Sequence, residues 1–332
     1  MLRVGIIGAG VMGRTHAECW SRLEDVKIQV VCDVQVERAE ALSRTYNCDV
    51  STSADDVIKR SDIDIVDICT PTPFHSEIAV SALEKGKHTL CEKPVARNLE
   101  SARKVVKTAR EVDVKFMTAH VVRFFPEYVT ARNLIDQGAI GIPRMARTKR
   151  GGQYPLGRWN DWFSDVDMSG GYLVDTGIHD FDYLRWIFGD VERVYASALT
   201  WRRLEHKDYG LVTLRFKSKA MAQVEIIWAQ PPGTPFNTGF ELIGTDGLIA
   251  YNSQDSSSLR IMVSNGDNIV QRAESPLTES PYLTEIRHFV SCIEENKEPS
   301  VTPEDAYKAL EVAIASLESA RINRPVSVGG DI

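Results

Sequence analysis

The chain has 332 residues, a formal net charge of −7, 43% hydrophobic and 26% charged residues. At roughly 150 residues per domain this length predicts about two domains, and the apolar content is sufficient for two buried cores. Lysine and arginine form no run that would neutralise a row of phosphates, which argues against nucleic acid as a partner. No apolar stretch approaches the ~20 residues of a membrane helix, so a membrane is not an expected partner either.

The six cysteines are scattered singly, without a C-x-x-C pair. Neither a zinc knuckle nor a thiol redox site is therefore predicted. Cys32, Cys69 and Cys91 lie in apolar, strand-like runs, where a free cysteine behaves as a small hydrophobic residue. We expect a reducing, cytoplasmic location and no bound metal.

Strand and helix patterns alternate through the first 120 residues. Alternation of this kind predicts parallel strands joined by right-handed crossovers, with helices on both faces of the sheet. We expect a dinucleotide-binding Rossmann domain over residues 1–122. The expected strands are residues 4–7, 28–32, 63–69, 88–91 and 115–119, and the helices between them include 14–23, 36–46, 75–85 and 99–111.

A glycine-rich turn follows the first strand and opens a helix. In such a turn Gly8 permits the tight bend, Gly10 lets the backbone approach a pyrophosphate, and Gly13 lets the helix pack closely on the strand. The helix N-terminus presents unpaired N–H groups and a positive dipole end to the phosphates. We expect Gly8, Gly10, Val11, Met12 and Gly13 to contact a dinucleotide.

Asp33 stands at the end of the second strand, 20 to 25 residues after the turn. A carboxylate there accepts hydrogen bonds from a ribose 2′-OH and repels a 2′-phosphate, so NAD is predicted over NADP. Arg38 lies one turn into the next helix, within reach of a 2′-phosphate. The alternative interpretation is that Arg38 is a solvated arginine on a helix face.

The second half has a different pattern, with a helix near 127–137 followed by long β-like runs. We expect an α+β domain over residues 123–332 with a large, mostly antiparallel, open-faced sheet. A wide, partly uncovered sheet favours a homodimer or homotetramer. The helix expected over 303–321 begins with an N-cap and a proline, and packing back on the first domain is one possibility for it. The expected strands are residues 144–150, 191–201, 209–216, 221–228, 240–243 and 259–263.

Lys93 directly follows a parallel strand, and the loops at the carboxyl ends of such strands face the cofactor crevice. There a lysine is able to position a substrate hydroxyl and relay its proton. His120 and Arg123 follow the last strand of this domain. Two interpretations stay open for them, as substrate contacts or as packing at the domain junction.

Asp175 and His179 are four residues apart, which places them on one face of a helix, and Asp182 continues that face. A histidine held by carboxylates is suited to accept a proton from an alcohol near neutral pH. The competing interpretation is an Asp–His pair that only buttresses the helix. A metal site is not favoured, because no further ligands follow at a typical spacing.

Taken together, these motifs resemble the Gfo/Idh/MocA family, which includes glucose–fructose oxidoreductase and inositol dehydrogenases. The likeness covers essentially the whole chain. It implies that Lys93, Asp175 and His179 carry catalysis, with His179 as general base, and that the Lys93–Pro94 bond is cis. The motifs are residues 8–13, Thr70-Pro71-Thr72-Pro73-Phe74-His75, Glu92-Lys93-Pro94, Arg123-Phe124, and Gly170-Gly171 followed by Asp175 and His179. Thr70, Pro71, His75, Glu92 and Lys93 thereby join the expected cofactor contacts.

The resemblance predicts NAD-dependent oxidation of a secondary alcohol on a sugar or cyclic polyol. Tyr154, Trp159 and Trp162 are expected as walls of the substrate pocket, together with His120, Arg123, Asp175 and His179. One alternative is a glycoside-processing enzyme that keeps NAD bound and works by transient oxidation and elimination. A second is a non-catalytic dinucleotide sensor, which would have little need of an intact set of Lys93, Asp175 and His179.

Overall fold

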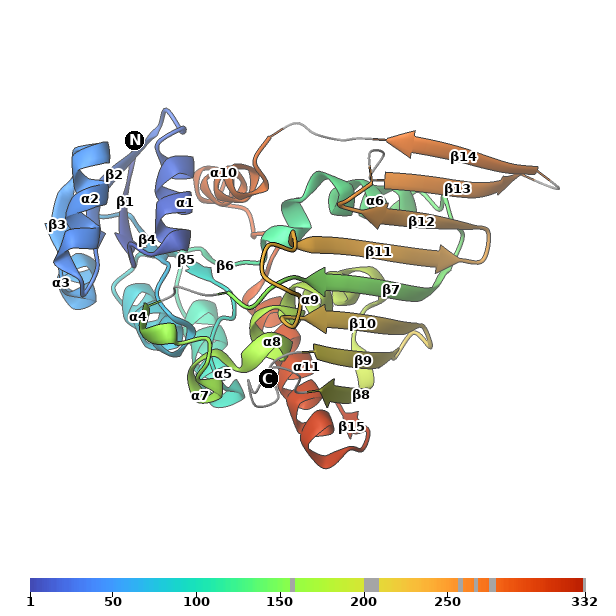
Figure 1. Cartoon of the computed structure of the whole chain (residues 1–332). Coiled ribbons are helices and arrows are strands. Elements are labelled where there is room, and N and C mark those ends of the chain that lie inside the picture. The colour runs from blue at the N-terminus through green and yellow to red at the C-terminus, as the bar shows by residue number, and fades with distance from the viewer. Residues whose placement is uncertain (156–158, 200–208, 256–258, 266–267, 275–278, 331–332) are drawn as a thin grey trace. The chain divides into compact units, whose positions relative to one another are not determined.

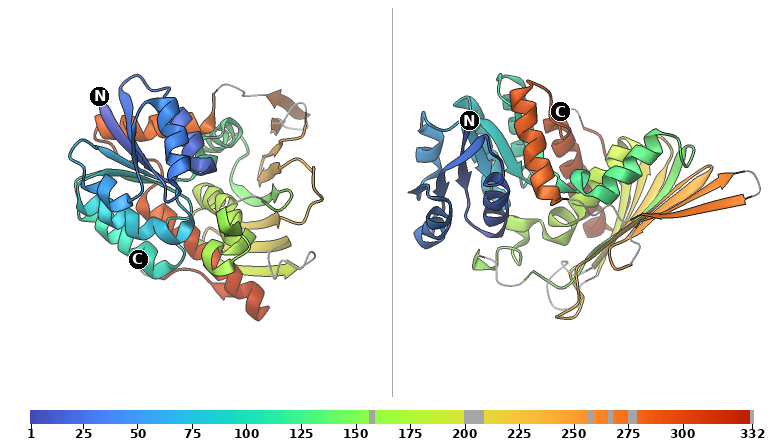
Figure 2. Two further views of the ribbon diagram at one scale, coloured as in Figure 1. Left: turned by 60° about the vertical axis from the view of Figure 1, so that its left-hand side comes forward. Right: turned by 90° about the horizontal axis from the view of Figure 1, so that it is seen from above.

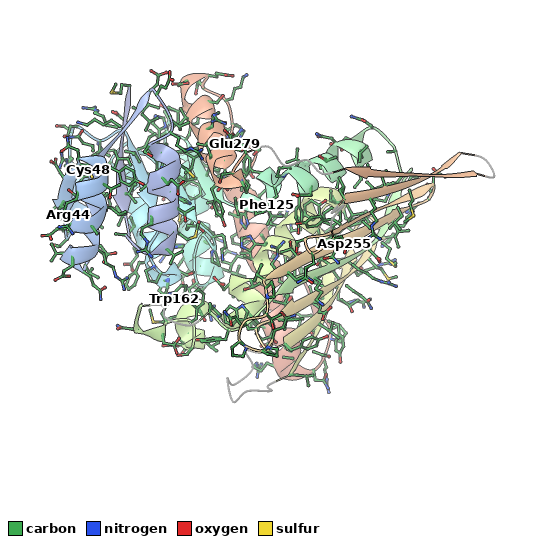
Figure 3. All side chains as sticks on the ribbon, turned by 45° about the horizontal axis from the view of Figure 1, so that its top comes forward. Arg44, Cys48, Phe125, Trp162, Asp255 and Glu279 are labelled. Atoms are coloured by element: carbon green, nitrogen blue, oxygen red, sulfur yellow. The ribbon has the colours of Figure 1, made fainter. Side chains whose placement is uncertain are left out.

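The computed structural model describes residues 1–155, 159–199, 209–255, 259–265, 268–274 and 279–330. Its contacts divide the chain into two compact units. The first comprises Met1–Phe124 and Glu279–Tyr307, and the second comprises Phe125–Thr278 and Lys308–Asp331. Phe125 and Glu279, where the chain enters and leaves the second unit, are labelled in Figure 3.

The first unit is built on a fully parallel six-stranded sheet with the strand order β3-β2-β1-β4-β5-β6 (Figure 1). The strand order reverses at β1 and β4, and in such sheets ligands bind outside the carboxyl ends of the strands at this reversal. The predicted Rossmann domain is confirmed. The strands are β1 (Leu2–Ile7), β2 (Val26–Cys32), β3 (Asp49–Ser51), β4 (Ile65–Ile68), β5 (His88–Glu92) and β6 (Phe116–Ala119).

The helices of the first unit begin at residues that satisfy their free backbone N–H groups. The side chain of Ser53 accepts a hydrogen bond from the backbone N–H of Asp56 and so caps α3 (Ala54–Lys59). Asn98 caps the helix that follows β5 in the same way, through Ser101. The helices are α1 (Val11–Trp20), α2 (Val36–Tyr46), α3 (Ala54–Lys59), α4 (His75–Glu84), α5 (Leu99–Arg110) and α10 (Pro281–Glu294), with short 3-10 helices η1 (Thr72–Phe74) and η2 (Val121–Phe124).

Helix α10 lies far along the chain yet belongs to the first unit. Its apolar face, formed by Leu283, Ile286, Phe289 and Val290, is buried in the same core as Trp20 of α1. From the sequence, residues 279–307 are expected in the second domain, with no helix predicted at 281–294. The structure differs because this amphipathic face finds its apolar partner on α1.

The second unit contains a nine-stranded sheet with the order β14-β13-β12-β11-β7-β10-β9-β8-β15. Its neighbouring strands pair antiparallel, except that β7 and β10 pair parallel, so the expectation of a mostly antiparallel sheet is confirmed. The strand expected over 191–201 ends at Leu199, and residues 200 and 201 lie outside the described residues. The strands are β7 (Pro143–Gly151), β8 (Val191–Leu199), β9 (Tyr209–Phe216), β10 (Met221–Ile227), β11 (Asn237–Gly244), β12 (Gly247–Asn252), β13 (Leu259–Asn265), β14 (Asn268–Glu274) and β15 (Val326–Ser327).

Helices of the second unit lie along one face of this sheet (Figure 2). The opposite face carries the exposed side chains of Tyr195, Leu199, Leu211 and Met221, which confirms the predicted open-faced sheet. The helices are α6 (Pro126–Asp136), α7 (Val166–Ser169), α8 (Gly171–Asp175) and α9 (Gly177–Phe188), with η3 (Trp159–Asp161); α11 (Pro303–Ile322) begins in the first unit and continues into the second.

A buried ion pair fixes α9 to the sheet. The Arg150 guanidinium on β7 donates to the Asp180 carboxylate at 2.6 Å and to the Tyr128 hydroxyl at 3.1 Å. Both charged side chains are almost fully buried, with 7% of Arg150 and 0% of Asp180 exposed. The ring of Tyr128 packs edge-on against Tyr183, 4.7 Å between centroids. Asp180 directly follows His179, so the pair anchors the helix segment that carries the predicted base.

Candidate functional site

The turn between β1 and α1 fits a dinucleotide. A Cβ on Gly8 would lie 2.5 Å from the Cys69 carbonyl oxygen, and one on Gly13 would lie 1.8 Å from the Gly8 carbonyl oxygen, so only glycine allows this packing. A Cβ on Gly10 would meet nothing within 4 Å, which leaves its backbone open to a ligand. Val11 and Met12 begin the helix, whose N-cap Gly10 provides no side chain to satisfy the free N–H groups. These N–H groups are suited to bind a pyrophosphate.

Asp33 follows β2 beside this turn. One carboxylate oxygen accepts the backbone N–H of Ala9 at 2.8 Å, and the other accepts that of Gln35 at 2.9 Å. The carboxylate is thereby held against the glycine turn, where an adenosine ribose would lie. Arg38 lies in the first turn of α2, its backbone N–H donating to Gln35. The geometry fits NAD, and a fixed negative charge at this point disfavours the 2′-phosphate of NADP.

The turn after β4 is connected to the Glu92-Lys93-Pro94 turn through His75. The His75 side chain is 1% exposed, and its two ring nitrogens lie 2.7 Å from the carbonyl oxygens of Thr70 and Pro94. The hydroxyl oxygen of Thr70 is buried and makes no hydrogen bond within the described residues. The Lys93–Pro94 bond is cis, as predicted. Each His75 ring nitrogen contacts a carbonyl oxygen of one of these two turns, so the ring holds the turns together. A direct contact between His75 and a cofactor stays a prediction.

A buried network that the sequence analysis missed lies behind the glycine turn. The His16 Nδ1 is 3.0 Å from both carboxylate oxygens of Asp67, and its Nε2 is 3.3 Å from Oε1 of Glu92. The Trp20 indole donates to Asp67 at 2.7 Å. The other Glu92 oxygen accepts the backbone N–H of Lys93 at 2.9 Å. The expected cofactor contact Glu92 is therefore already engaged on both of its oxygens.

The positions of the two carboxylates favour the imidazolium form of His16. The Nδ1 of His16 is hydrogen-bonded to Asp67 and its Nε2 lies at ion-pair distance from Glu92, so a protonated ring has a carboxylate on each side. Burial opposes this charge, but the charge of Asp67 and the contacts with Asp67 and Cys69 raise the pKa of His16 well above its ordinary value. Burial opposes ionisation of Glu92, but its contact with His16, and then the charges of Lys93 and His75, lower its pKa.

This buried imidazolium makes the stability of the protein depend on pH. The contribution is fully present below the ordinary pKa of 6.5 and is lost as pH rises through the higher pKa of the folded state. Above pH 6.5 the unfolded chain releases the proton that the folded chain keeps. The unfolding free energy should therefore fall with rising pH, with His16 contributing up to ~1.4 kcal/mol per pH unit. Urea unfolding between about pH 6.5 and pH 9 tests this, and a His16→Gln variant should lack the added slope.

Three members of this region, His16, Asp67 and Cys69, have metal-ligating atoms within 4.8 Å of one another in the described part of the chain. Burial raises the pKa of the Cys69 thiol to about 12, so it stays protonated and is a poor ligand. The Asp67 carboxylate is already bonded to His16 and Trp20. An ion pair therefore explains the cluster better than a metal centre.

Asp175 and His179 lie on either side of a helix break. Asp175 ends α8 and His179 is in the first turn of α9, whereas the sequence analysis placed both on one helix. Thr176, between the helices, accepts a hydrogen bond from the Trp228 indole at 2.9 Å. Both predicted catalytic side chains are partly exposed. Asp182, expected on the same face, differs from both because it is fully buried.

Aromatic side chains surround Trp228 near this break. Tyr154 and Phe163 pack edge-on against Trp228, at 5.6 and 5.5 Å between centroids, and Trp162 stacks on Phe163 at 4.2 Å. The Tyr154 hydroxyl donates to Asp161. Two predicted pocket walls, Tyr154 and Trp162, are thus in one aromatic cluster with Trp228. Trp159 lies in η3, and its side chain is outside the described structure.

His120 and Arg123 are deeply buried, with 0% and 5% of each residue exposed. The Arg123 guanidinium donates to the Ser300 carbonyl at 2.8 Å and to Asp305 at 3.1 Å. These contacts support the packing interpretation of Arg123, because its charge is compensated by residues at the start of α11. Substrate contact by His120 stays a prediction.

Family models match both halves of the chain. An oxidoreductase family model with an NAD-binding Rossmann fold matches residues 2–120, and a GFO/IDH/MocA C-terminal domain model matches residues 128–250. An uncharacterized oxidoreductase of Bacillus subtilis, YrbE, is 30% identical over 98% of this chain and 96% of its own length. The chain belongs to the GFO/IDH/MocA family. It is an oxidoreductase with an NAD-binding Rossmann domain, as the sequence predicted.

Further family members are similar over the full length. Inositol 2-dehydrogenase of Rhizobium meliloti is 29% identical over 98% of this chain and 99% of its own. The solved structure of levoglucosan dehydrogenase in complex with NADH aligns with a TM-score of 0.91 at 25% identity, covering 99% of this chain and all of the other. No helix in the described ranges is long and apolar enough to cross a membrane.

Proposed function

We propose that this GFO/IDH/MocA protein oxidises a secondary alcohol of a sugar or cyclic polyol, with NAD as the oxidant. The observation that carries the proposal is the pair of partly exposed side chains, Asp175 and His179, at the break between α8 and α9. A carboxylate and an imidazole of this kind are suited to hold and deprotonate a hydroxyl group. The likeness to inositol 2-dehydrogenase and to levoglucosan dehydrogenase with NADH supports the substrate class.

In this proposal His179 accepts the proton of the substrate hydroxyl while the C–H bond on the same carbon breaks, which leaves a ketone. Bound NAD supplies the hydride acceptor. Lys93 donates a hydrogen bond to the substrate oxygen and takes part in the proton transfer. Asp175 orients the substrate and stabilises the positive charge that develops on His179. Gly8, Gly10, Val11, Met12, Gly13, Asp33 and Thr70 form the dinucleotide site.

The aromatic cluster of Tyr154, Trp162, Phe163 and Trp228 provides an apolar wall for the substrate ring. A sugar or polyol presents C–H groups on the faces of its ring, and these pack against aromatic side chains. Polar groups around the wall then select the pattern of hydroxyl groups. We further place the protein in the cytoplasm, and we propose a homodimer or homotetramer formed through the exposed face of the nine-stranded sheet.

Asp33 should set the preference for NAD. Asp33→Asn keeps an acceptor oxygen for the Ala9 N–H but removes the negative charge. We expect NAD to bind about tenfold more weakly, because a hydrogen bond to a charged group contributes ~1.5–3 kcal/mol, and NADP to bind more tightly. Fluorescence titration with both dinucleotides measures this. An unchanged ratio of the two dissociation constants would refute the role of Asp33.

The activity is tested by following nicotinamide absorbance with NAD and with NADP against inositols, aldoses, levoglucosan and glycosides. The proposal predicts NADH formation with at least one inositol or sugar, and a product one oxidation level higher. Glycoside cleavage without net NADH would instead identify an enzyme that retains its NAD. Dinucleotide binding without any turnover would identify a sensor.

A further inference from the structure

The buried network of His16, Asp67 and Glu92 connects α1 to the backbone of Lys93. His16 is fully buried one and a half turns into α1. Asp67 lies on β4 and Glu92 at the end of β5, so adjacent parallel strands place one carboxylate on each side of the ring. The second oxygen of Glu92 accepts the Lys93 N–H at 2.9 Å. Each contact in this path joins residues of the first unit.

We propose that His16 is a positioning residue, a permanent buried cation that keeps the Glu92 carboxylate ionised and fixed, so that Glu92 in turn fixes the backbone of Lys93. The inference rests on the proposed function, in which Lys93 assists proton transfer. His16 lies three positions after Gly13, the last glycine of the dinucleotide-binding turn.

The charge balance of the network carries this inference. The carboxylates of Asp67 and Glu92 lie on either side of the His16 ring, at ion-pair distances of 3.0 and 3.3 Å. The other titratable groups that face His16 are the thiols of Cys69 and Cys19, and burial raises the pKa of both, so they stay neutral. A buried carboxylate favours its neutral form unless an opposite charge lies close to it, and His16 contributes most among the groups that lower the pKa of Glu92. Without His16, only the charges of Lys93 and His75 would lower the pKa of Glu92, and Glu92 would lose its contact with α1.

A second contact holds the same turn from its other end. The His75 Nδ1 lies 2.7 Å from the carbonyl oxygen of Pro94, and its other nitrogen lies 2.7 Å from that of Thr70. The backbone on both sides of Lys93 is therefore bound to a buried histidine ring, directly at Pro94 and through Glu92 at Lys93 itself. A lysine on a fixed backbone keeps its ammonium group aligned with the reacting atoms, which is the requirement for efficient proton transfer.

Kinetics of His16→Gln and Glu92→Gln test the inference. Each variant should lower kcat about 10- to 100-fold with little change in KM, and the double variant should be no slower than His16→Gln alone, because both act through one path. The acidic fall of the pH–rate profile should lie at higher pH in His16→Gln than in the wild type, because Glu92 loses the cation that lowers its pKa. His88→Gln, at the opposite end of β5, is the control and should keep the wild-type kcat. The inference would be overturned if the reductions of kcat in the two single variants were additive in the double variant, or if only KM changed.

A measurement without substrate separates this inference from the proposed reaction. Reductive methylation with ¹³C-formaldehyde labels lysines, and Lys93→Arg identifies the resonance of Lys93. That resonance should shift in His16→Gln and in Glu92→Gln but stay in place in His88→Gln. The ring nitrogens of His16 should both remain protonated at neutral pH in ¹⁵N spectra. A neutral His16, or an unmoved Lys93 resonance in both variants, would overturn the inference even if the wild type oxidises a polyol. If His16→Gln fails to fold, Glu92→Gln alone decides.

Discussion

Replacing His179 with glutamine should lower kcat by about two to four orders of magnitude, the usual contribution of a positioned general base. The amide keeps a polar side chain of similar length but accepts no proton at neutral pH. His179 lies in the first turn of α9 and is partly exposed, so the change leaves the core of the second unit intact. Single-turnover measurements with NAD and a reactive polyol give the chemical step directly.

The dinucleotide should still bind to this variant with a wild-type dissociation constant, because the glycine turn and Asp33 belong to the other unit. Raising the pH should restore part of the rate, since hydroxide then replaces the missing base. Lys93→Ala should likewise reduce kcat while its fold is retained. If kcat of His179→Gln falls by less than tenfold while NAD binds normally, His179 is not the base.

Breaking the buried Arg150–Asp180 pair should cause the largest loss of stability. Arg150→Met removes the cation but leaves the Asp180 carboxylate, which is 0% exposed, without its charged partner. Removing one partner of a buried ion pair costs about 3–5 kcal/mol. The Tyr128 hydroxyl also loses its donor, and burial already raises the pKa of this group above its ordinary value. Urea unfolding should show a lower midpoint with little change in slope.

The double variant Arg150→Met/Asp180→Leu is the matched control. It removes both charges and fills the site with apolar groups, and such replacements are often neutral or stabilising. We expect it to recover most of the lost stability. If the double variant is as unstable as Arg150→Met, the loss comes from the packing of the methylene groups of Arg150 and not from the unpaired carboxylate. Destabilisation of Arg150→Met by less than about 1 kcal/mol would contradict the account of the pair.

Local patterns predicted the first unit well, because each of its features depends on neighbours in sequence. The glycine turn and the alternation of strands and helices both arise from residues that are close in sequence. Helix α10 was missed although Leu283, Ile286, Phe289 and Val290 have helical spacing. Its apolar face was visible in the sequence, but its partner on α1 lies more than 260 residues away.

The buried network could not be predicted from the sequence for a related reason. His16 and Asp67 are 51 residues apart, and Asp67 and Glu92 are 25 residues apart. They meet because β4 and β5 are neighbouring strands and α1 contributes His16 between their two carboxylates. The break at Thr176 also depends on distant residues. A Cβ on Gly177 would lie 2.6 Å from the side chain of Ile226 on β10, so the sheet determines how closely α9 approaches.

The fate of a labelled hydrogen tests the central claim most directly. A polyol deuterated on the carbon that bears the reactive hydroxyl is incubated with NAD, and the nicotinamide product is analysed by mass spectrometry. Direct hydride transfer predicts one deuterium in the released NADH and a ketone at the labelled carbon. Unlabelled NADH, or a changed sugar with no net NADH while NAD stays bound, would contradict an NAD-dependent polyol dehydrogenase.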